Sequence, residues 1–394
     1  MEDFRVSRFA KNSKMDLGIL TQHLELLRET LSQEENFSNF NSFYRRLMTG
    51  KFLATKNHFH LEQVTFSLDN KLKIAGMVFL PGGEWGAPGG VGCLAVAADV
   101  TESQVQNFWL ALRKHYQGIQ LIAPFAGHHY LGFSLPDRHP QMVPQSKDLL
   151  FEPARPQKIG VMTTALNSRV ERLFRNPKIT PIYRQYFSLE TRMSPERIEV
   201  LQSELRQQPK NFRIRKLNRL RPRAELAIMN QLVNACFINH FDFCPLSEDE
   251  NWDLMKWSLP LFQSGCFLFL MDGDKEIGFA FGMLDYNQIF EGRSDFLNFL
   301  RFCFRKGQIC RGRLIHIGML PKYRGQKLVK YLRHQLLLNL TSLGASTIES
   351  SYIDQANVAS LGNVESTGAK ALHKFSTYLV AGTDFPTRST LENG

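Results

Sequence analysis

The segment 314–332 carries residue types that suit the binding of a phosphorylated ligand. It predicts a strand, a short basic turn that contains Gly325, and then a helix. Such a turn leaves backbone N–H groups unpaired at the start of the helix, where the positive end of the helix dipole also attracts anions. Arg324, Lys327 and Lys330 add positive charge. The turn is therefore a candidate phosphate site, and the alternative is a basic helix cap without a ligand.

The turn resembles the pyrophosphate-binding pattern [Q/R]-x-x-G-x-[G/A] of the GNAT superfamily of acyl-CoA N-acyltransferases. The six residues in question are Arg324, Gly325, Gln326, Lys327, Leu328 and Val329. Arg324 and the nearby Gly325 fit the pattern, whereas Lys327 and Val329 replace its small residues. The resemblance implies that these six residues bind acetyl-CoA or another acyl-CoA as a co-substrate.

Two flanking segments extend the resemblance. In the family, the apolar residue two positions before the proline, here Met319, holds the thioester carbonyl with its backbone N–H, an oxyanion-type contact. Asn357, Ser360 and Gly368 match the spacing N-x-x-[AS]-x7-G, and Asn357 would contact the pantetheine arm. The family tyrosine that protonates the departing thiolate is Val364 here. Either water, Ser360 or another group protonates the thiolate, or the site is slow or inactive.

Three titratable residues are candidates for the chemistry of transfer to an amine, which needs a base because the attacking nitrogen must be neutral. His316 precedes the turn on the same strand, and its ordinary pKa of about 6.5 suits a base. The alternative is a hydrogen-bonded strand histidine. Glu349, on the next predicted strand, is a base if burial raises its pKa, and otherwise a solvated surface residue. Asp285 would pair with a substrate cation or cap its strand.

The resemblance covers residues 210–380 well and residues 64–190 more weakly, as in a subgroup of this length with two GNAT-like halves. It implies an α/β fold of tandem GNAT-like domains, each with a mixed, centrally splayed β-sheet flanked by helices. We expect an N-terminal helical segment, a degenerate GNAT-like domain without a phosphate cradle, and an acyl-CoA-binding GNAT domain. These span residues 1–60, 61–205 and 206–394, respectively.

Local signals predict the elements that position these residues. Thr101-x-x-Gln104 is a capping box, Ser194 followed by proline begins a helix, and the turn 272–274 joins a hairpin. The glycine-rich segment 82–92 predicts a loop. Strands are expected at 64–68, 72–80, 93–97, 119–122, 211–217, 314–319, 347–353 and 372–380, and helices at 225–239, 327–340 and 357–366. A strand–helix–strand order occurs around 93–122 and again around 314–353, which indicates internal duplication.

Composition limits the classes of partner. The chain has 394 residues and a net charge of +11, so it suits anionic partners or is an ordinary basic protein. The basic run 206–223 would bind RNA or serve as a solvated linker. Six scattered cysteines without a C-x-x-C pair favour a reducing compartment, hence the cytoplasm. We expect no membrane span, and His115 and His128-His129 predict no metal site.

The predicted function is N-acyltransfer, in which an acetyl or longer acyl group moves from CoA to a small-molecule or protein amine. Two alternatives are a non-catalytic GNAT-like protein that binds a ligand or partner, and a basic RNA-binding protein. Phenylalanines at 296, 299, 302 and 304 fall on a predicted helix. They would pack in a core or line an acyl-chain pocket.

Overall fold

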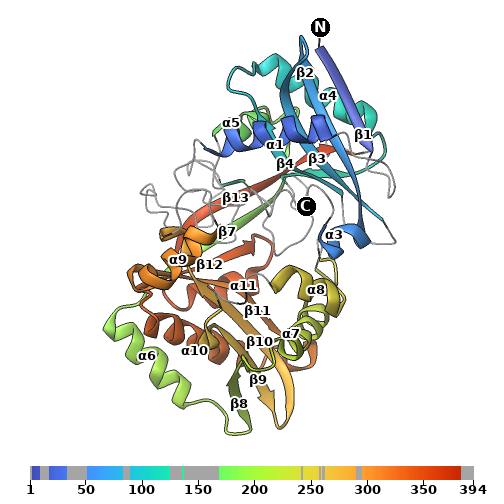
Figure 1. The fold of residues 1–394 in the computed structure, drawn as a ribbon. Coiled ribbons are helices and arrows are strands. Elements are labelled where there is room, and N and C mark those ends of the chain that lie inside the picture. The colour runs from blue at the N-terminus through green and yellow to red at the C-terminus, as the bar shows by residue number, and fades with distance from the viewer. Residues whose placement is uncertain are drawn as a thin grey trace.

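The computed structural model describes residues 2–8, 17–32, 51–82, 89–124, 135–136, 168–240, 243–256, 259, 262–289 and 295–382. The strands are β1 (Glu2–Arg8), β2 (Phe59–Leu68), β3 (Lys71–Pro81), β4 (Gly89–Val96), β5 (Leu121–Ala123), β6 (Leu135–Pro136), β7 (Ile182–Arg192), β8 (Phe212–Lys216), β9 (Phe267–Asp272), β10 (Lys275–Leu284), β11 (Arg311–Met319), β12 (Thr347–Asp354) and β13 (Lys370–Ala381). They form one sheet in the order β1-β2-β3-β4-β5-β13-β7-β12-β11-β10-β9-β8, with β6 paired to β13 (Figure 1).

Helices cover both faces of this sheet (Figure 1). They are α1 (Leu17–Ser32), α3 (Leu53–His58), α4 (Glu102–His115), α5 (Ser168–Glu171), α6 (Pro195–Arg206), α7 (Pro222–Phe237), α8 (Glu248–Met255), α9 (Asp295–Arg305), α10 (Leu328–Ser342) and α11 (Val358–Glu365). In the N-terminal half, β1 to β5, helices α1 and α4 pack in separate hydrophobic clusters on the two sheet faces. In the C-terminal half, β8 to β12, helices α7 and α10 take the equivalent places. No described helix is long and apolar enough to cross a membrane.

The two halves repeat one pattern of pairing. In each, two antiparallel strand pairs lead to a parallel pair connected by a helix: β4-α4-β5 and β11-α10-β12. The parallel pairs are short. Strands β4 and β5 pair only at Gly89–Gly90, and β11 and β12 pair only along Arg311–Leu314, although β11 continues to Met319. Each pair then separates, so the predicted tandem fold with centrally splayed mixed sheets is confirmed.

Strand exchange joins the two halves. Strand β13, near the C-terminal end of the chain, pairs with β5 of the N-terminal half. Strand β7, which follows the N-terminal half, pairs with β12 of the C-terminal half. Strands β7 and β13 also pair with each other, which makes one continuous sheet. The domain boundaries at 60 and 205 stay a prediction.

The structure confirms most of the elements that local sequence signals predict. Thr101 and Gln104 form both bonds of the capping box that begins α4, and the Ser194 hydroxyl accepts from the Arg197 N–H at the start of α6. Gly273 has φ +58° in the turn between β9 and β10, a conformation that favours glycine. The helix predicted for the phenylalanines is α9. The histidines at 128 and 129 and residues 137–160 lie outside the described residues.

Two local predictions were wrong. The glycine-rich segment 82–92 is not all loop, because Gly89–Gly92 is the first half of β4. A Cβ on Gly89 would lie 2.7 Å from a Leu121 methyl and 2.9 Å from the Phe79 carbonyl, so this glycine permits close strand packing. The segment 1–60 is not only helical, because Glu2–Arg8 forms β1 on the outer edge of β2.

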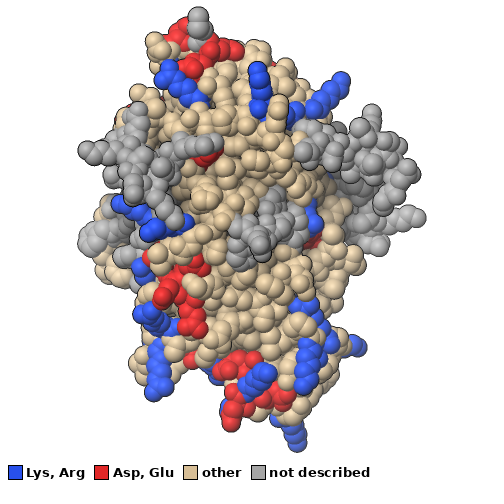
Figure 2. All heavy atoms as spheres, turned by 90° about the vertical axis from the view of Figure 1, so that its right-hand side faces the viewer, with Lys and Arg blue, Asp and Glu red and all other residues tan. Residues whose placement is uncertain are grey.

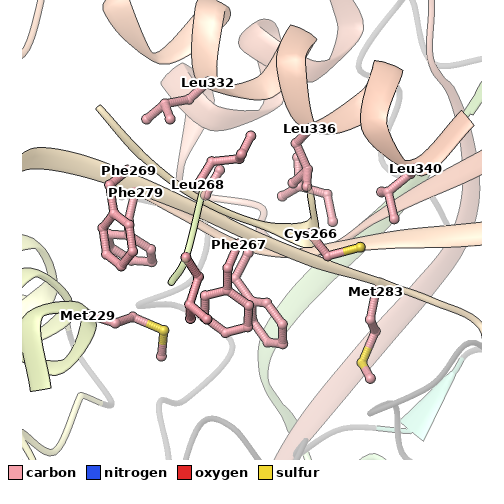
Figure 3. Packing of buried hydrophobic residues seen from close by; sticks show 14 of the residues in the cluster. Met229, Cys266, Phe267, Leu268, Phe269, Phe279, Met283, Leu332, Leu336 and Leu340 are labelled. Atoms are coloured by element: carbon pink, nitrogen blue, oxygen red, sulfur yellow. The ribbon is translucent and has the colours of Figure 1, made fainter. Parts of the chain in front are cut away.

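The core of the C-terminal half lies on both sides of β9 and β10. Leu332, Leu336 and Leu340 of α10 cover one side. On the other side, Phe267, Phe269 and Phe279 pack toward Met229 of α7 (Figure 3). Burying a large apolar side chain contributes about 1.5–3 kcal/mol. This two-sided core and the pairing with β10 position β11 and the candidate turn that follows it.

A buried carboxylate connects α3 to α8. Glu250 accepts hydrogen bonds from Asn57 (2.6 Å) and from the Ser247 N–H (2.7 Å), and its carboxylate lies 3.1 Å from His58 Nε2. Hydrogen bonds to Cys244 and Glu250 raise the pKa of His58 to about 10. Burial opposes ionisation of Glu250, but hydrogen bonds from His58, Ser247 and Asn57 lower its pKa to about 2. Both groups are therefore charged at neutral pH.

We expect Glu250→Gln to lower the free energy of unfolding by about 1.5–3 kcal/mol at pH 5.5, as for loss of a hydrogen bond to a charged group. The His58 imidazolium loses its carboxylate partner, while the shape of the side chain is kept. Urea unfolding at pH 5.5 measures the loss. The loss should shrink as the pH rises from about 6.5, where the unfolded imidazole becomes neutral, to about 10, where the folded His58 does. Glu248→Gln in the same helical turn, at an exposed position, is the control. Equal losses in the two variants would contradict the prediction.

Candidate functional site

A β-bulge in β11 sets the direction of the candidate residues. Phe281 of β10 pairs with His316, and the next residue, Gly282, pairs with Leu314, so Ile315 has no partner across the pair. The extra residue shifts the alternation of side chains along β11. A Cβ on Gly312 would contact α10, whereas a Cβ on Gly318 would contact Phe279 and Cys236 on the α7 side. His316, two residues before Gly318, therefore faces α7.

The gap between β11 and β12 exposes one backbone amide of the candidate site. Leu320 N–H donates to the Ile277 carbonyl of β10 at 3.0 Å. Because successive backbone N–H groups of a strand point to opposite edges, the Met319 N–H points away from β10. On that side β12 has already diverged, since the pairing ends at Leu314 and Ser350. The amide thus faces the gap, as the resemblance requires for a contact with a thioester carbonyl.

The turn before α10 keeps the backbone shape of a phosphate cradle. Gly325 has φ +80°, and a Cβ built on it would have no heavy atom within 4 Å. Lys327, at the position of a family glycine, also adopts the left-handed conformation, with φ +58° and ψ +12°. This conformation costs a non-glycine residue about 1–2 kcal/mol. Residues 324–327 are exposed. Lys327 therefore keeps a left-handed conformation that glycine would adopt without this cost.

The first turn of α10 has no side-chain cap, because Lys327 stands at the cap position without a side-chain hydrogen bond to the helix. Orphan N–H groups at such an end bind anions. Leu328 is 2% exposed and Val329 packs beside it against the same core, so these two residues offer their backbone and not their side chains. Gln326 is exposed. The amides, the open side of Gly325 and the Lys327 charge fit the phosphates of CoA.

Arg324 forms two hydrogen bonds to the backbone of neighbouring elements. Its Nε donates to the Met319 carbonyl at 3.2 Å, and its Nη2 donates to the Cys236 carbonyl of α7 at 2.7 Å. These bonds fasten the turn to β11 and to the last turn of α7. The guanidinium accordingly positions the cradle, and its role in direct phosphate binding stays a prediction.

The local structure of α11 accounts for the spacing of Asn357, Ser360 and Gly368. The Asn357 side chain caps α11 by accepting from the Ser360 N–H at 3.1 Å. Gly368 has φ +73° after the helix, and a Cβ there would lie 2.2 Å from the Arg197 guanidinium. Val364 packs with Phe187 and is buried. The Asn357 side-chain NH2 is left for a pantetheine contact, which stays a prediction.

His316 lies in a strongly desolvated position. Its ring centroid is 6.0 Å from that of Phe237 in α7. Burial, with smaller contributions from the charges of Arg313 and His240, lowers the pKa of His316 to about 3. A general base works best when its pKa lies near the operating pH. The histidine is neutral at pH 7, as a base must be, but it binds a proton much more weakly than its ordinary pKa predicts.

The two candidate carboxylates are both buried. Glu349 is 1% exposed on β12, so the alternative of a solvated surface residue was wrong. It lies opposite Arg313 in the pairing of β11 with β12. Asp285 is fully buried and forms an ion pair with Arg311, whose Nε lies 2.7 Å from Oδ2. This ion pair accounts for Asp285 without a substrate, so the structure does not support its predicted contact with a substrate cation.

Comparison with known proteins identifies the fold of the chain. No protein-family model and no curated sequence matches the chain. Among solved structures, the chain is similar to a tandem GNAT protein from the clavulanic acid biosynthesis pathway, with 11% identity and a TM-score of 0.51 over 97% of this chain and 100% of that one. The chain has the tandem GNAT fold. A GCN5-related N-acetyltransferase from Sphaerobacter thermophilus is also similar, with 11% identity and a TM-score of 0.45 over 98% of both chains.

Four polar residues of the central strands were not singled out by the sequence analysis. Arg313 is 2% exposed on β11, and His373, Ser188 and Thr377 lie on β13 and β7. An arginine within an apolar strand is a signal in the sequence that indicates a buried polar site, because arginine is rarely buried without a partner. The others gave no signal, since their positions in the sheet depend on strand exchange. Within the described residues, no group of three or more His, Cys, Asp or Glu side chains could hold a metal ion.

Proposed function

We propose that the protein is an acyl-CoA-dependent N-acyltransferase whose C-terminal half binds the CoA thioester. The observation that carries the proposal is the positive-φ turn at the uncapped start of α10, next to the gap between β11 and β12. The N-terminal half has an equivalent helix, α4, but a complete capping box occupies its first amides. We therefore assign the cofactor to the C-terminal half alone.

Each proposed site residue of the C-terminal half has a separate role in binding or chemistry. The amides of the turn and the charge of Lys327 hold the phosphates, and Asn357 contacts the pantetheine arm. Bound acyl-CoA supplies a thioester carbon as the electrophile. The Met319 N–H lies where it would stabilise negative charge on the carbonyl oxygen. Glu349, a buried carboxylate on the neighbouring strand, is the proposed proton acceptor, and the neutral His316 orients the acceptor amine by a hydrogen bond.

Ligand-induced stabilisation tests the proposal. A ligand that binds only the folded protein stabilises it by about 2.7 kcal/mol at a hundredfold excess over Kd. We expect CoA and acetyl-CoA to raise the melting temperature measurably in differential scanning fluorimetry. Dephospho-CoA should stabilise less, because the basic side chains would lack the ribose phosphate. The absence of any shift at millimolar CoA would remove the cofactor assignment.

A non-catalytic protein with the same fold is the second candidate. Val364 packs in the core where the family tyrosine would stand, and the pKa of His316 is lowered to about 3. Both observations favour binding without turnover. Thiol release from acetyl-CoA in the presence of an acceptor decides between the candidates, because a binding protein would show the thermal shift alone. The acyl-chain length and the cytoplasmic location remain proposals.

RNA binding receives less support. Within the basic run 206–223, Arg213, Arg215 and Arg223 form ion pairs with Asp274, with Glu225 and Glu276, and with Asp249, respectively. Figure 2 shows basic and acidic side chains interspersed on the face it presents, without a continuous basic stripe. Counterion release needs cations that are free to meet phosphates. These ion pairs favour the linker interpretation of the run.

A further inference from the structure

The helix α9 directs its apolar side away from the core. Phe302 is buried, and its ring packs edge-on against Tyr286 with the ring centres 5.3 Å apart. Asn298, four residues earlier and therefore on the same side of the helix, is also buried. On the opposite side, Leu297 is 50% exposed and Phe304 is 83% exposed. A surface helix normally turns its apolar side to the core, so the orientation of α9 is reversed.

The exposed apolar side chains form one continuous patch. Leu297, the half-buried Leu300 and Phe304 follow the spacing i, i+3 and i+7, which places them in one row along the helix. Phe299, which is 46% exposed, and the exposed Cys303 are four residues apart and widen this row. We call these five residues the apolar face of α9. Other exposed large apolar side chains of the described residues lie singly elsewhere.

This exposure decides between the roles expected for the phenylalanines. Phe302 packs in the core of the C-terminal half. Phe299 and Phe304 do neither of the two things expected, because a core or an acyl-chain pocket would bury an aromatic ring. A contiguous exposed apolar patch instead marks a surface that binds a partner.

Basic side chains border the apolar face. Helical spacing places Arg301 and Arg305 between its exposed side and its buried side, and Lys306 follows directly after the helix. Arg305 and Lys306 are exposed, and neither forms an ion pair with any described residue. Asp295, the first residue of α9, is the only acidic residue in the sequence of this helix. The C-terminal part of α9 therefore combines exposed apolar area with uncompensated positive charge.

We propose that the apolar face of α9 binds the surface of a membrane that contains anionic lipids. Phenylalanine and leucine side chains on one side, bordered by lysine and arginine, are typical of helices that lie in the plane of the bilayer interface. The apolar face would enter the boundary between headgroups and acyl chains, where Arg305 and Lys306 would meet lipid phosphates. With 11 residues, α9 is about 16 Å long and lies on the membrane without crossing it. The proposal does not depend on acyl transfer.

The size of the apolar face favours a membrane over a second copy of this chain. A large aromatic side chain buries about 150–250 Å² when it is fully covered, so this partly exposed patch offers roughly 400 Å². A stable dimer needs about 800 Å² from each partner. An interfacial helix has no such threshold, because its affinity grows with both the apolar area and the attraction to anionic lipids.

Co-sedimentation of the full chain with lipid vesicles tests the proposal. One vesicle is pure phosphatidylcholine, and the other contains one third phosphatidylglycerol. Each basic residue near an anionic surface strengthens binding about 5-fold, so we expect Arg305 and Lys306 to favour the anionic vesicle about 25-fold. Replacing both by glutamine should remove this preference. Phe304→Ser should weaken binding to the anionic vesicle at least about 10-fold, because one aromatic side chain no longer enters the lipid.

Two controls separate this effect from unfolding and from non-specific attraction. Phe304→Ser should keep the melting temperature of the wild type, because the side chain is 83% exposed. Leu110→Ser removes a leucine that is 53% exposed on α4, and it should bind both vesicles like the wild type. Equal losses of binding in the two variants would overturn the proposal.

Two further outcomes would also overturn the proposal. One is a wild-type protein that stays in the supernatant with both vesicles. The other is a dimer in light scattering that Phe304→Ser dissociates, because the apolar face would then bind a second copy of the chain. The thermal shift with CoA is independent of these results, so its absence would refute the proposed function and leave the membrane surface standing.

Discussion

Replacing Gly325 with aspartate should abolish the binding of CoA while the protein stays folded. The Cβ of residue 325 points to open space, with no heavy atom within 4 Å outside the glycine and its two chain neighbours. The left-handed backbone at φ +80° is one that aspartate and asparagine tolerate better than most residues. The new carboxylate, however, would stand where the pyrophosphate is proposed to lie. Two like charges about 4 Å apart repel by roughly 4 kcal/mol at an effective dielectric constant of 20.

Gly325→Asn is the matched control, because it has nearly the same shape and no charge. We expect isothermal titration calorimetry to show a Kd for CoA at least about 100-fold weaker in Gly325→Asp than in Gly325→Asn. A repulsion of 2.8 kcal/mol already gives this factor, since 1.4 kcal/mol is tenfold. If both variants lose binding equally, the loss comes from a change of backbone conformation at residue 325 and not from the charge of the new side chain. If both bind CoA as well as the wild type, the cradle is elsewhere.

Local signals in the sequence were sufficient for most elements of the fold. A capping box such as Thr101 with Gln104, or a hairpin turn such as 272–274, depends on residues that are neighbours in the chain. The turn at Gly325 belongs to the same class, because its backbone conformation follows from a glycine between a strand and a helix. These features were predicted since their causes lie within a few residues.

The features that the sequence did not reveal depend on residues far apart in the chain. Strand β7 gave no signal, because its polar face, with Ser188, is buried among other polar groups and breaks the usual apolar alternation. The burial of Glu349 follows from the pairing of β12 with β7, which comes from the other half. The lowered pKa of His316 likewise requires the packing of Phe237 and the nearby charge of Arg313.

Acid should destabilise the protein strongly between pH 6.5 and 4.5, because at least two histidines, the buried His23 and the half-buried His316, are neutral in the folded protein. Burial lowers the pKa of His23 to about 4, although its hydrogen bond to the Cys93 carbonyl opposes the shift. His316 has a pKa of about 3. In the unfolded chain both imidazoles bind a proton near pH 6.5, whereas the folded protein does not. Lowering the pH therefore favours unfolding.

The expected size of the effect is a large part of the total stability. Two pH units below the unfolded pKa, each neutral histidine costs about 2.7 kcal/mol, since one unit is about 1.36 kcal/mol. The two histidines together remove roughly 5 kcal/mol, against a typical stability of 5–15 kcal/mol. His58 offsets part of this loss above pH 6.5, because its raised pKa keeps it charged in the folded protein while the unfolded imidazole takes up a proton, which favours the folded state by about 1.4 kcal/mol between pH 7.5 and 6.5.

Urea unfolding at pH 7.5 and pH 4.5 measures the loss. His23→Gln removes one titrating imidazole from a site where its ring contacts the Cys93 carbonyl and the Gln63 amide, so the pH dependence should be smaller by about 2.7 kcal/mol. His115→Gln, at an exposed position on α4, should keep the full dependence. For each variant, the comparison uses the difference in the free energy of unfolding between pH 7.5 and pH 4.5. This difference removes any cost of the substitution that is independent of pH. An unchanged pH dependence in His23→Gln would show that His23 is protonated in the folded protein or exposed to solvent.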